Sequence, residues 1–296
     1  MATDPLSDIL KLEYAETVVT GGFSAAGRWA IRFPPPDKIK FCAIVKGGCW
    51  IKLDGEAAPV WAATGDILLL AASHGFVMCS DADTAPVDAM ALFLRTAGNM
   101  MRLGDAIETR PADQDDFVQM GGHVRLDPAN GGLLADVLPR WIHIQAAAPE
   151  ATPLRWLLAQ LVGERASELP GAGIASVHLA QLMFVQILRA HLQASWPLAP
   201  GWLRAVSDPR LAPALRLMHA EPGRPWQLEE LARAAAMSRT TFAQHFKTAA
   251  GVAPLTYLTQ WRMRVAQRAL REEGTAVSVL AGQLGYTSES AFSNAF

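Results

Sequence analysis

A short polar segment near the carboxyl end carries side chains that could bind the bases and phosphates of a nucleic acid. These side chains are Arg239, Thr240, Thr241, Gln244 and Lys247. Arginine pairs with guanine, glutamine with adenine, and threonine contacts a thymine methyl group or a phosphate. Phe242 and Phe246 are four residues apart in the same segment. A helix here would therefore bury both phenylalanines on one face and present the polar residues on the other.

The elements that would position this helix form a unit that occurs twice. In the first copy a short apolar-periodic helix, Gln227–Ala235, leads through a turn of small residues to Ser238, which would cap a helix over Arg239–Ala250. In the second copy the matching helices are Ala276–Leu284 and Ser288–Phe296. Equivalent residues are offset by 49 positions up to Tyr286 and by 50 from Ser288 onward. Each copy has the pattern of a helix-turn-helix.

The second copy offers different chemistry from the first. Ser288, Ser290 and Asn294 lie on its predicted exposed side, together with Glu289. A glutamate carboxylate is repelled by the phosphates of a nucleic acid unless it accepts a hydrogen bond from cytosine. Alternatively, it is an acidic residue that favours the positive end of the helix dipole. Both interpretations stay open for Glu289.

Charge is distributed unequally along the chain. Residues 1–206 carry a net charge of −5 and residues 207–296 a net charge of +3. Between residues 238 and 271 there are six basic residues, Arg262 among them, and no acidic one. Such an excess is expected of a phosphate-binding surface, although a solvated basic face would look the same. The repeat favours the first interpretation.

The composition is that of a globular protein with room for two domains. The chain has 296 residues, of which 51% are hydrophobic and 18% charged. The longest apolar runs are too short to span a bilayer or carry charges, so we expect no membrane segment and a cytoplasmic location. Three cysteines, Cys42, Cys49 and Cys79, have no metal-type spacing and do not indicate a disulfide framework. The sequence contains no Ser/His/Asp, Cys/His or phosphate-loop arrangement that would predict an enzyme.

The amino-terminal part alternates between short β-rich runs and turns. Phe41–Val45 and Cys49–Leu53 flank a glycine-containing turn and predict a β-hairpin. Ile67–Leu70 and Ala85–Leu94 predict further strands, and residues 1–20 have little pattern. Many short strands at close spacing favour a small barrel or sandwich.

From Gly131 the pattern becomes helical. We expect helices over Gly132–Ile144, Leu154–Leu169 and Ile174–Trp196, then a linker that ends near Ser207. A further helix is predicted over Arg210–His219. Helices appended to a barrel must bury their apolar stripes, either on that barrel or on a second copy of the chain.

Residues 208–296 resemble the DNA-binding domain of AraC-family transcription regulators. The resemblance lies in Pro225–Ala232, Met237–Phe242, Gly251–Pro254, Tyr257–Met263 and Leu284–Phe292. It implies that Pro254–Leu270 is one long helix that holds the two helix-turn-helix units apart, so that they enter successive major grooves of double-stranded DNA. Family members continue with a closing helix, so the resemblance implies that the domain is truncated at Phe296.

The amino-terminal part resembles the cupin-type sensor half of certain AraC-like regulators. The matching residues are Phe41–Gly47, Trp50–Gly55, Ala63–Leu70 and Gly121–Leu126. Relatives often have histidines where this chain has Cys42 and Phe76, so we expect no metal and no other cofactor. The resemblance also implies homodimerisation through the helices that follow the barrel.

The barrel interior is the expected site of a small-molecule effector. Its candidate lining residues are Trp29, Ile31, Cys42, Ile44 and Phe76. Each of them could instead simply fill a core, and a thiol-based sensor that uses Cys42 is an alternative input. Arg95 and Arg102 could meet an anionic ligand, but isolated arginines usually form solvated ion pairs instead.

Together these features predict an α+β protein with two domains. Residues 1–200 would form a cupin-like effector-binding and dimerisation domain, with a small β-barrel over about 20–127 and helices over about 130–196. Residues 207–296 would form an all-α, double helix-turn-helix DNA-binding domain. The predicted function is effector-controlled, sequence-specific regulation of transcription. The alternatives are a redox-responsive regulator of the same fold and a cupin-type enzyme.

Overall fold

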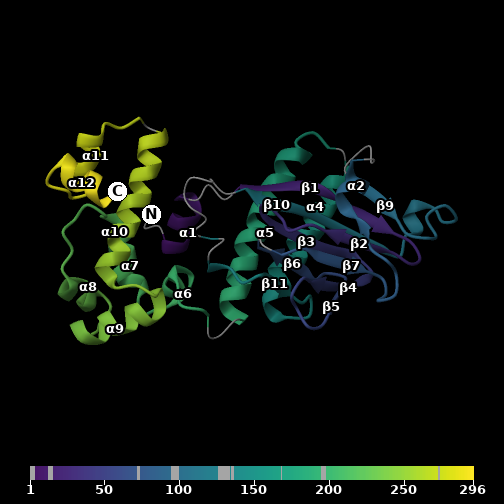
Figure 1. The fold of residues 1–296 in the computed structure, drawn as a ribbon, viewed down its shortest axis with the longest axis horizontal. Helices are drawn as coiled ribbons and strands as arrows, with labels where there is room; N and C mark the ends of the chain where they lie inside the picture. Colours follow the sequence, from purple (N-terminus) through teal and green to yellow (C-terminus); the bar gives the residue numbers. More distant parts are fainter. Residues whose placement is uncertain are drawn as a thin grey trace. The chain divides into compact units, whose positions relative to one another are not determined.

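The computed structural model describes residues 4–12, 16–71, 74–94, 100–125, 134, 137–167, 169–194, 198–272 and 274–296. The chain forms two compact units (Figure 1). The sheet unit comprises residues 16–125 and 138–195, and the helical unit comprises residues 1–15, 126–137 and 196–296. The predicted α+β class is confirmed, with a cupin-like sheet region followed by an all-α region.

Two sheets build the first unit. The six-stranded sheet has the order β11-β6-β3-β10-β1-β9. Its strands are β1 (Glu16–Ala25), β3 (Ile39–Lys46), β6 (Ile67–Leu70), β9 (Met100–Leu103), β10 (Phe117–Arg125) and β11 (Trp141–Ile144). The five-stranded sheet has the order β5-β4-β7-β2-β8. Its strands are β2 (Ala30–Phe33), β4 (Gly48–Leu53), β5 (Val60–Ala63), β7 (Phe76–Cys79) and β8 (Val87–Asp88).

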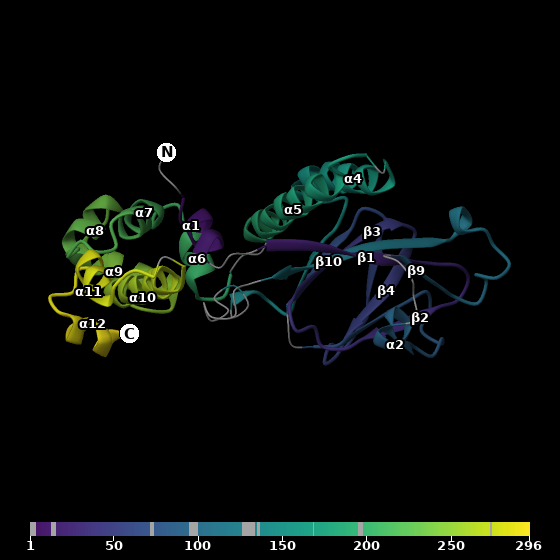
Figure 2. The same ribbon diagram turned by 90° about the horizontal axis from the view of Figure 1, so that it is seen from above.

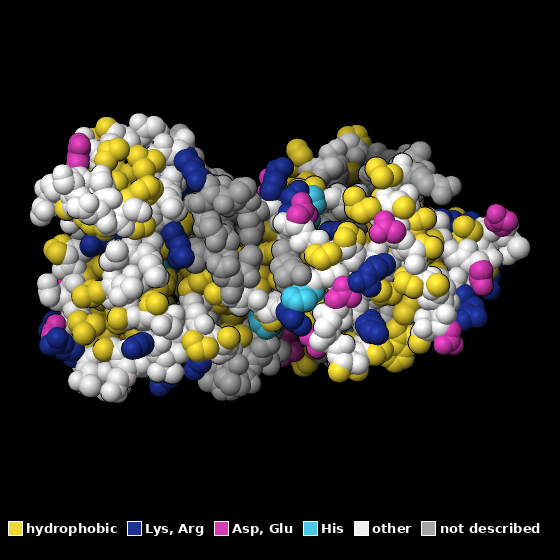
Figure 3. All heavy atoms as spheres, viewed as in Figure 1, with side chains coloured by type: hydrophobic (Ala, Val, Ile, Leu, Met, Phe, Trp, Pro, Cys, Tyr) yellow, Lys and Arg dark blue, Asp and Glu magenta, His cyan; other side chains and the backbone are white. Residues whose placement is uncertain are grey.

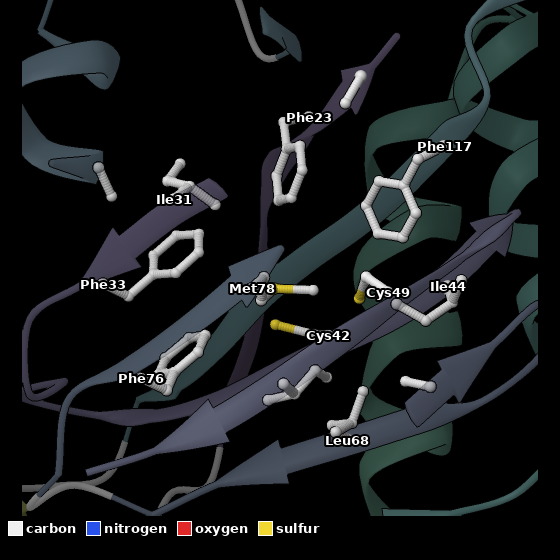
Figure 4. Packing of buried hydrophobic residues seen from close by; sticks show 14 of the residues in the cluster. Phe23, Ile31, Phe33, Cys42, Ile44, Cys49, Leu68, Phe76, Met78 and Phe117 are labelled. Atoms are coloured by element: carbon white, nitrogen blue, oxygen red, sulfur yellow. The ribbon is translucent and has the colours of Figure 1, made fainter. Parts of the chain in front are cut away.

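One apolar core fills the space between the two sheets. Phe23, Ile44 and Phe117 enter it from the six-stranded sheet, and Ile31 and Met78 enter it from the five-stranded sheet (Figure 4). The side chains of a strand alternate between its faces, so each strand contributes every second residue to this core. Burial of such aromatic and aliphatic side chains stabilises the fold by about 1.5–3 kcal/mol each.

The predicted hairpin between Phe41–Val45 and Cys49–Leu53 is wrong. Both segments are strands, but β3 pairs with β6 and β10 while β4 pairs with β5 and β7. Gly47 is the corner at which the chain leaves one sheet for the other, and its φ of 79° lies in the left-handed region. A Cβ atom there would lie 2.2 Å from the carbonyl oxygen of Asp116. Glycine therefore allows the corner, and long-range partners replace the expected local pairing.

Helices accompany the sheets. They are α2 (Ala89–Phe93), α4 (Thr152–Ser167) and α5 (Ala172–Ala194), with the 3-10 turns η1 (Ala112–Gln114) and η3 (Pro149–Ala151). Figure 2 shows α4 and α5 side by side along the outer face of the six-stranded sheet. The predicted strand over Ala85–Leu94 is wrong beyond Asp88, because that side chain caps α2 by accepting a hydrogen bond from Ala91 N. The predicted helix Gly132–Ile144 is wrong at its end, where β11 pairs with β6, and most of its first half lies outside the described residues.

The helical unit contains α1 and all helices from α6 onward. Their bounds are α1 (Pro5–Leu12), α6 (Trp202–Ser207), α7 (Ala212–Ala220), α8 (Leu228–Ala234), α9 (Arg239–Ala250), α10 (Pro254–Glu272), α11 (Val277–Gln283) and α12 (Glu289–Ala295). The predicted helices of both repeats and the long helix between them are confirmed within two residues. The segment expected to be a linker contains α6, which buries Trp202 and Leu203.

Helix α1 lies where the sequence shows little pattern. Asp4 caps it by accepting a hydrogen bond from Ser7 N at 3.0 Å, and Ile9 and Leu12 are buried. The Asp8 carboxylate lies 3.3 Å from Nδ1 of His219 on α7. His219 in turn stacks on Trp261 of α10, with 3.8 Å between ring centroids. An amino-terminal helix is thus part of the core of the helical unit.

Helix α5 is the one described helix that is long and apolar enough to cross a membrane by length and composition. This is weak evidence, since a core helix passes the same test. Within the sheet unit, α5 packs against α4 and β1, and Gln181 accepts a hydrogen bond from Thr17 N at 2.9 Å. These contacts are those of a helix that covers a sheet.

Candidate functional site

The two repeats share one turn geometry. In the first, Met237 N donates to Ala232 O, and in the second Tyr286 N donates to Ala281 O, both at 2.9 Å. The left-handed residue of the turn is Ala236, with φ 52°, in the first copy and Gly285, with φ 80°, in the second. The following serine then caps the second helix of each copy, since Ser238 accepts from Thr241 N and Ser288 from Ala291 N. Both repeats are helix-turn-helix units.

Helix α9 presents the predicted polar residues on its exposed side. Phe242 and Phe246 are fully buried beneath it, whereas Arg239, Thr240 and Gln244 are exposed. The Arg239 guanidinium pairs with Glu229 of α8 at 3.0 Å, and both side chains are more than half exposed. Such a surface pair contributes little, so a base or a phosphate can displace it. Lys247 is exposed and has no ion pair among the described residues.

Thr241 and Ser288 have local structural roles. The Thr241 hydroxyl lies 2.8 Å from Ser238 Oγ, inside the cap of α9. Ser288 Oγ accepts its hydrogen bond from Ala291 N at 3.1 Å. Ser290 and Asn294 of α12 are exposed, as is Glu289. Ser288 is exposed too, but its hydroxyl is used in the cap of α12.

Arg262 binds protein backbone. Its Nε donates to Pro222 O at 2.5 Å and its Nη2 to Arg224 O at 2.9 Å. The guanidinium also lies over the ring of Tyr286, 5.9 Å from its centroid. Pro222 and Arg224 precede the first helix-turn-helix unit, and Tyr286 lies in the turn of the second. Arg262 therefore joins the two helix-turn-helix units.

A glycine contact lies beside this arginine. A Cβ atom on Gly285 would lie 2.1 Å from Gly223 O, and one on Gly223 would lie 2.0 Å from Gln283 O. Backbone therefore packs directly on backbone where the two helix-turn-helix units meet. A further contact ties α9 to the end of α6, because His245 Nε2 lies 2.5 Å from Oδ2 of Asp208, the residue that follows α6.

Charge on the helical unit agrees with the sequence pattern. In Figure 3 the basic side chains over this unit outnumber the acidic ones. Helix α9 carries the basic residues Arg239 and Lys247 and no acidic residue, while Glu229 of α8 pairs with Arg239. A net positive, exposed helix face is the electrostatic requirement for binding a phosphate backbone.

The sheet unit contains a cavity of about 310 Å³. It lies among β1, β3 and β10 of one sheet, Phe33 and Phe76 of the other, and α2. Its lining residues are Thr20, Gly21, Gly22, Phe33, Lys40, Phe41, Cys42, Phe76, Met90, Phe93, Gln119, Gly121, Gly122 and His123. Cavities of this size and apolar character hold small molecules.

The predicted effector residues divide into two groups. Cys42 and Phe76 line the cavity. Trp29, Ile31 and Ile44 are almost completely buried in the sheet-to-sheet core and do not line it. Sequence reasoning missed Lys40, which lies two residues before Cys42 and therefore on the same face of β3.

Arg102 does not face this cavity. It pairs with the buried Asp115 at 2.6 Å and donates further hydrogen bonds to Ile107 O and Arg110 O. The pKa of the Asp115 carboxyl is lowered mainly by the hydrogen bond from Arg102. Arg102 is thus a structural ion-pair partner, and Arg95 lies outside the described residues.

The three cysteines are buried thiols. Burial raises the pKa of Cys42 to about 11 and also raises the pKa values of Cys49 and Cys79. A thiol sensor needs an accessible thiolate, which burial disfavours. Among the described residues, no group of three or more His, Cys, Asp or Glu side chains could hold a metal ion.

Comparison with known proteins gives the family. A cupin model matches residues 4–193, and a helix-turn-helix domain model matches residues 231–296. Two AraC-like transcription regulators, from Streptomyces antibioticus and Streptomyces lividans, are each 37% identical over 293 residues, which is 99% of this chain and 94% of theirs. The HTH-type transcriptional regulator AlkR of Acinetobacter baylyi (strain ATCC 33305 / BD413 / ADP1) is 31% identical over 91% of this chain and 87% of its own.

These matches cover both units, and the geometry of the repeats agrees with them. Two capped helix-turn-helix units lie on either side of a long helix, and a two-sheet cupin fold precedes them. The chain therefore belongs to the AraC-like family of transcription regulators and has a DNA-binding helix-turn-helix domain.

Proposed function

We propose that this regulator is controlled by a small molecule that binds in the cavity of the sheet unit. The observation that carries the proposal is the cavity itself, since about 310 Å³ beside an otherwise filled core is room for a ligand. In the neighbouring core, Phe23, Ile31 and Phe117 are fully buried. An effector would change DNA affinity by a coupling free energy between the two sites.

We also propose which residues read the DNA. Arg239, Thr240 and Gln244 are exposed on the first turns of α9, the part of a recognition helix that enters the major groove. Lys247 is suited to a phosphate, and Ser290 and Asn294 are the candidates on α12. Thr241, Arg262 and Ser288 would support these contacts indirectly, through the cap of α9, the junction of the two units and the cap of α12.

The regulator is further proposed to act as a homodimer through α4 and α5. Ile174, Val177 and Leu182 of α5 are exposed, as is Trp156 of α4. Exposed apolar residues gathered on one helix pair are typical of an interface. A location in the cytoplasm, where promoter DNA is accessible, follows from this function.

The experiment is a selection of binding sites from a random double-stranded DNA library, followed by gel retardation with the selected site. We expect sequence-selective retardation by the full chain that weakens steeply as salt rises. A metabolite library added to the same assay should then identify compounds that shift affinity. Retardation equal for selected and random DNA would contradict sequence-specific regulation, and metal analysis of the purified protein would reveal a cupin-type enzyme.

A further inference from the structure

The cavity has apolar walls. Phe33 and Phe76 stack with 4.7 Å between ring centroids, and Phe93 is a third aromatic residue in the lining. Met90 and Phe93 of α2 line the cavity and are also exposed, 54% and 43%, so it reaches the surface beside this helix. The body of a ligand here would lie against aromatic rings and a thioether, which favour apolar groups.

One wall of the cavity consists of backbone. Gly21 and Gly22 of β1 and Gly121 and Gly122 of the neighbouring β10 line it, and Gly21 pairs directly with Gly121. A Cβ atom on Gly121 would lie 2.7 Å from Gln119 Nε2 and 3.0 Å from Phe41 O. These glycines therefore let neighbouring atoms pack against the main chain, and the main chain itself forms this wall of the cavity.

Cationic groups gather at one end of this apolar space. Lys40 of β3 pairs with His123 of β10 across the sheet, in line with the next inward pair, Cys42 and Gly121. Both Lys40 and His123 line the cavity, and Lys40 Nζ lies 5.7 Å from the centre of the Phe33 ring. Lys40 makes no ion pair with a described residue. Lys40 is half-buried, so its ammonium group is accessible to a carboxylate that enters the cavity.

The surroundings of His123 are also positive. Burial lowers the pKa of its imidazole first, and the charges of Lys38, Arg125 and Lys40 lower it further, while Asp37 opposes them. The remaining polar lining is already used in part, because Gln119 Nε2 donates to Met120 O at 2.8 Å. The described lining of the cavity thus offers a lysine ammonium group and a neighbouring imidazole at the end of an apolar slot.

We infer that the effector is a monocarboxylate with an apolar body, held by the Lys40 ammonium group and hydrogen-bonded by His123, with its body between Phe33, Phe76 and Phe93. This inference rests on the proposed effector function of the cavity. An amine would be repelled by Lys40. A phosphate ester would call for the several donors, usually including arginine, that phosphate sites have, and the described lining holds no arginine.

Calorimetric titration of the full chain tests this ligand class with matched probes. The probes are octanoate and 4-phenylbutyrate, with 1-octanol and octylamine as the uncharged and cationic counterparts of octanoate. We expect at least one carboxylate to bind at least tenfold more tightly than the alcohol, and the amine not to bind. Equal binding of octanoate, alcohol and amine, or no binding of either carboxylate, would overturn the inference.

Two lysine variants locate the binding site. Lys40→Met should weaken carboxylate binding about tenfold or more and leave binding of the alcohol unchanged. Lys52→Met, an exposed lysine on β4 that does not line the cavity, is the control and should bind as the parent does. Unchanged carboxylate binding by Lys40→Met would overturn the assignment. A polar metabolite that shifted DNA affinity would overturn the ligand class while leaving effector control intact, so the two proposals fail separately.

Discussion

Arg239 and Lys247 are both exposed on α9, but their loss should affect DNA binding in different ways. Arg239→Ala removes a candidate contact to a base, so we expect a loss of about 1–3 kcal/mol at one base position and relaxed preference there. Lys247→Ala removes a candidate phosphate contact and should weaken binding to all sequences, with a salt slope smaller by about one. Titrations with the selected site and its single-base variants at several salt concentrations measure both effects. Identical profiles for the two variants would contradict these roles.

Asp66 should make the sheet unit sensitive to acid. Its carboxylate accepts hydrogen bonds from Ala63 N and Ala146 N and lies 2.8 Å from His143 Nε2. Burial acts to raise its pKa, but the hydrogen bonds from His143, Ala146 and Ala63 outweigh burial, so the pKa is lowered. The stabilisation is therefore present above the pKa of the unfolded chain, which is about 3.9, and is lost as the pH falls through the lower folded value.

Asp66→Ala tests this role. It removes the carboxylate that accepts from Ala63 N and Ala146 N, both in half-buried residues, and we expect a loss of about 1–3 kcal/mol in total from the free energy of unfolding near neutral pH. Urea unfolding across the acid range should show a smaller pH dependence for the variant than for the parent. Thr64→Ala, in the same turn but exposed, is a control. Parallel pH profiles for Asp66→Ala and the parent would contradict the role of the carboxylate.

Single residues were harder to assign than elements. Trp29, Ile31 and Ile44 are apolar and point inward, as expected, but the open end of the core lies near Cys42 and Phe76. The position of the cavity depends on how β3, β10 and α2 pack together. The types of the individual residues do not predict this packing. For Arg262, a basic residue on a long helix predicts a phosphate contact, whereas its partners are carbonyl oxygens about 40 positions earlier in the chain.

At the scale of elements, the two helix-turn-helix turns should respond oppositely to glycine and alanine. Ala236 has a φ of 52°, a left-handed conformation that costs a non-glycine residue about 1–2 kcal/mol. Glycine also increases the conformational entropy of the unfolded chain, which destabilises the folded state by about 0.4–1 kcal/mol. Ala236→Gly should therefore stabilise α8 and α9 by up to about 1 kcal/mol. Hydrogen exchange of their amides measures this local change.

Gly285→Ala is the opposing test. Its added methyl group would meet Gly223 O at 2.1 Å, so a steric clash adds to the left-handed strain. We expect a loss of more than about 2 kcal/mol, measured by amide exchange in α11 and α12. Similar small effects of both substitutions would show that the turns are not held as described.

Repeats and caps made the helices predictable, while sheet partners were not. Ser238 and the spacing of Phe242 and Phe246 correctly predict α9 from its first residue to its last. The glycines around Gly47 correctly predict a sharp turn, but a turn does not specify whether the next strand stays in the same sheet. The sheets that β3 and β4 join are determined by pairing with β10 and β7, and both of these strands are distant in sequence.

At the scale of the molecule, the proposed dimer should dissociate when α5 becomes charged. Ile174→Glu combined with Leu182→Glu places two like charges on each exposed apolar stripe, so we expect the mass in solution to halve and DNA affinity to fall. Light scattering coupled to size exclusion measures the mass. Val87→Glu, at an exposed apolar position on β8, is the matched control. A parent chain that is already monomeric would contradict the proposal.

The composition of the helical unit was only partly predictable. Its carboxyl-terminal helices follow from the repeat, but α1 joins them from the other end of the chain. The sequence does contain a local signal, since Asp4 and Pro5 precede Ser7, Ile9 and Leu12 in the pattern of a capped, one-sided helix. That pattern predicts a helix but does not indicate which unit it packs on.

If both helix-turn-helix units read DNA, as proposed, the contact between Gly223 and Gly285 and the bonds of Arg262 should hold the two units as one rigid body. Their angular phase about the DNA axis is then fixed by the protein. Each base pair inserted between the two reading sites turns one of them by about 35° relative to the other. Because the protein cannot follow, the DNA must untwist. Affinity should fall with one inserted pair and further with two, and circular substrates that are already underwound should recover part of it. Equal affinity for all spacings would mean that the readers move independently.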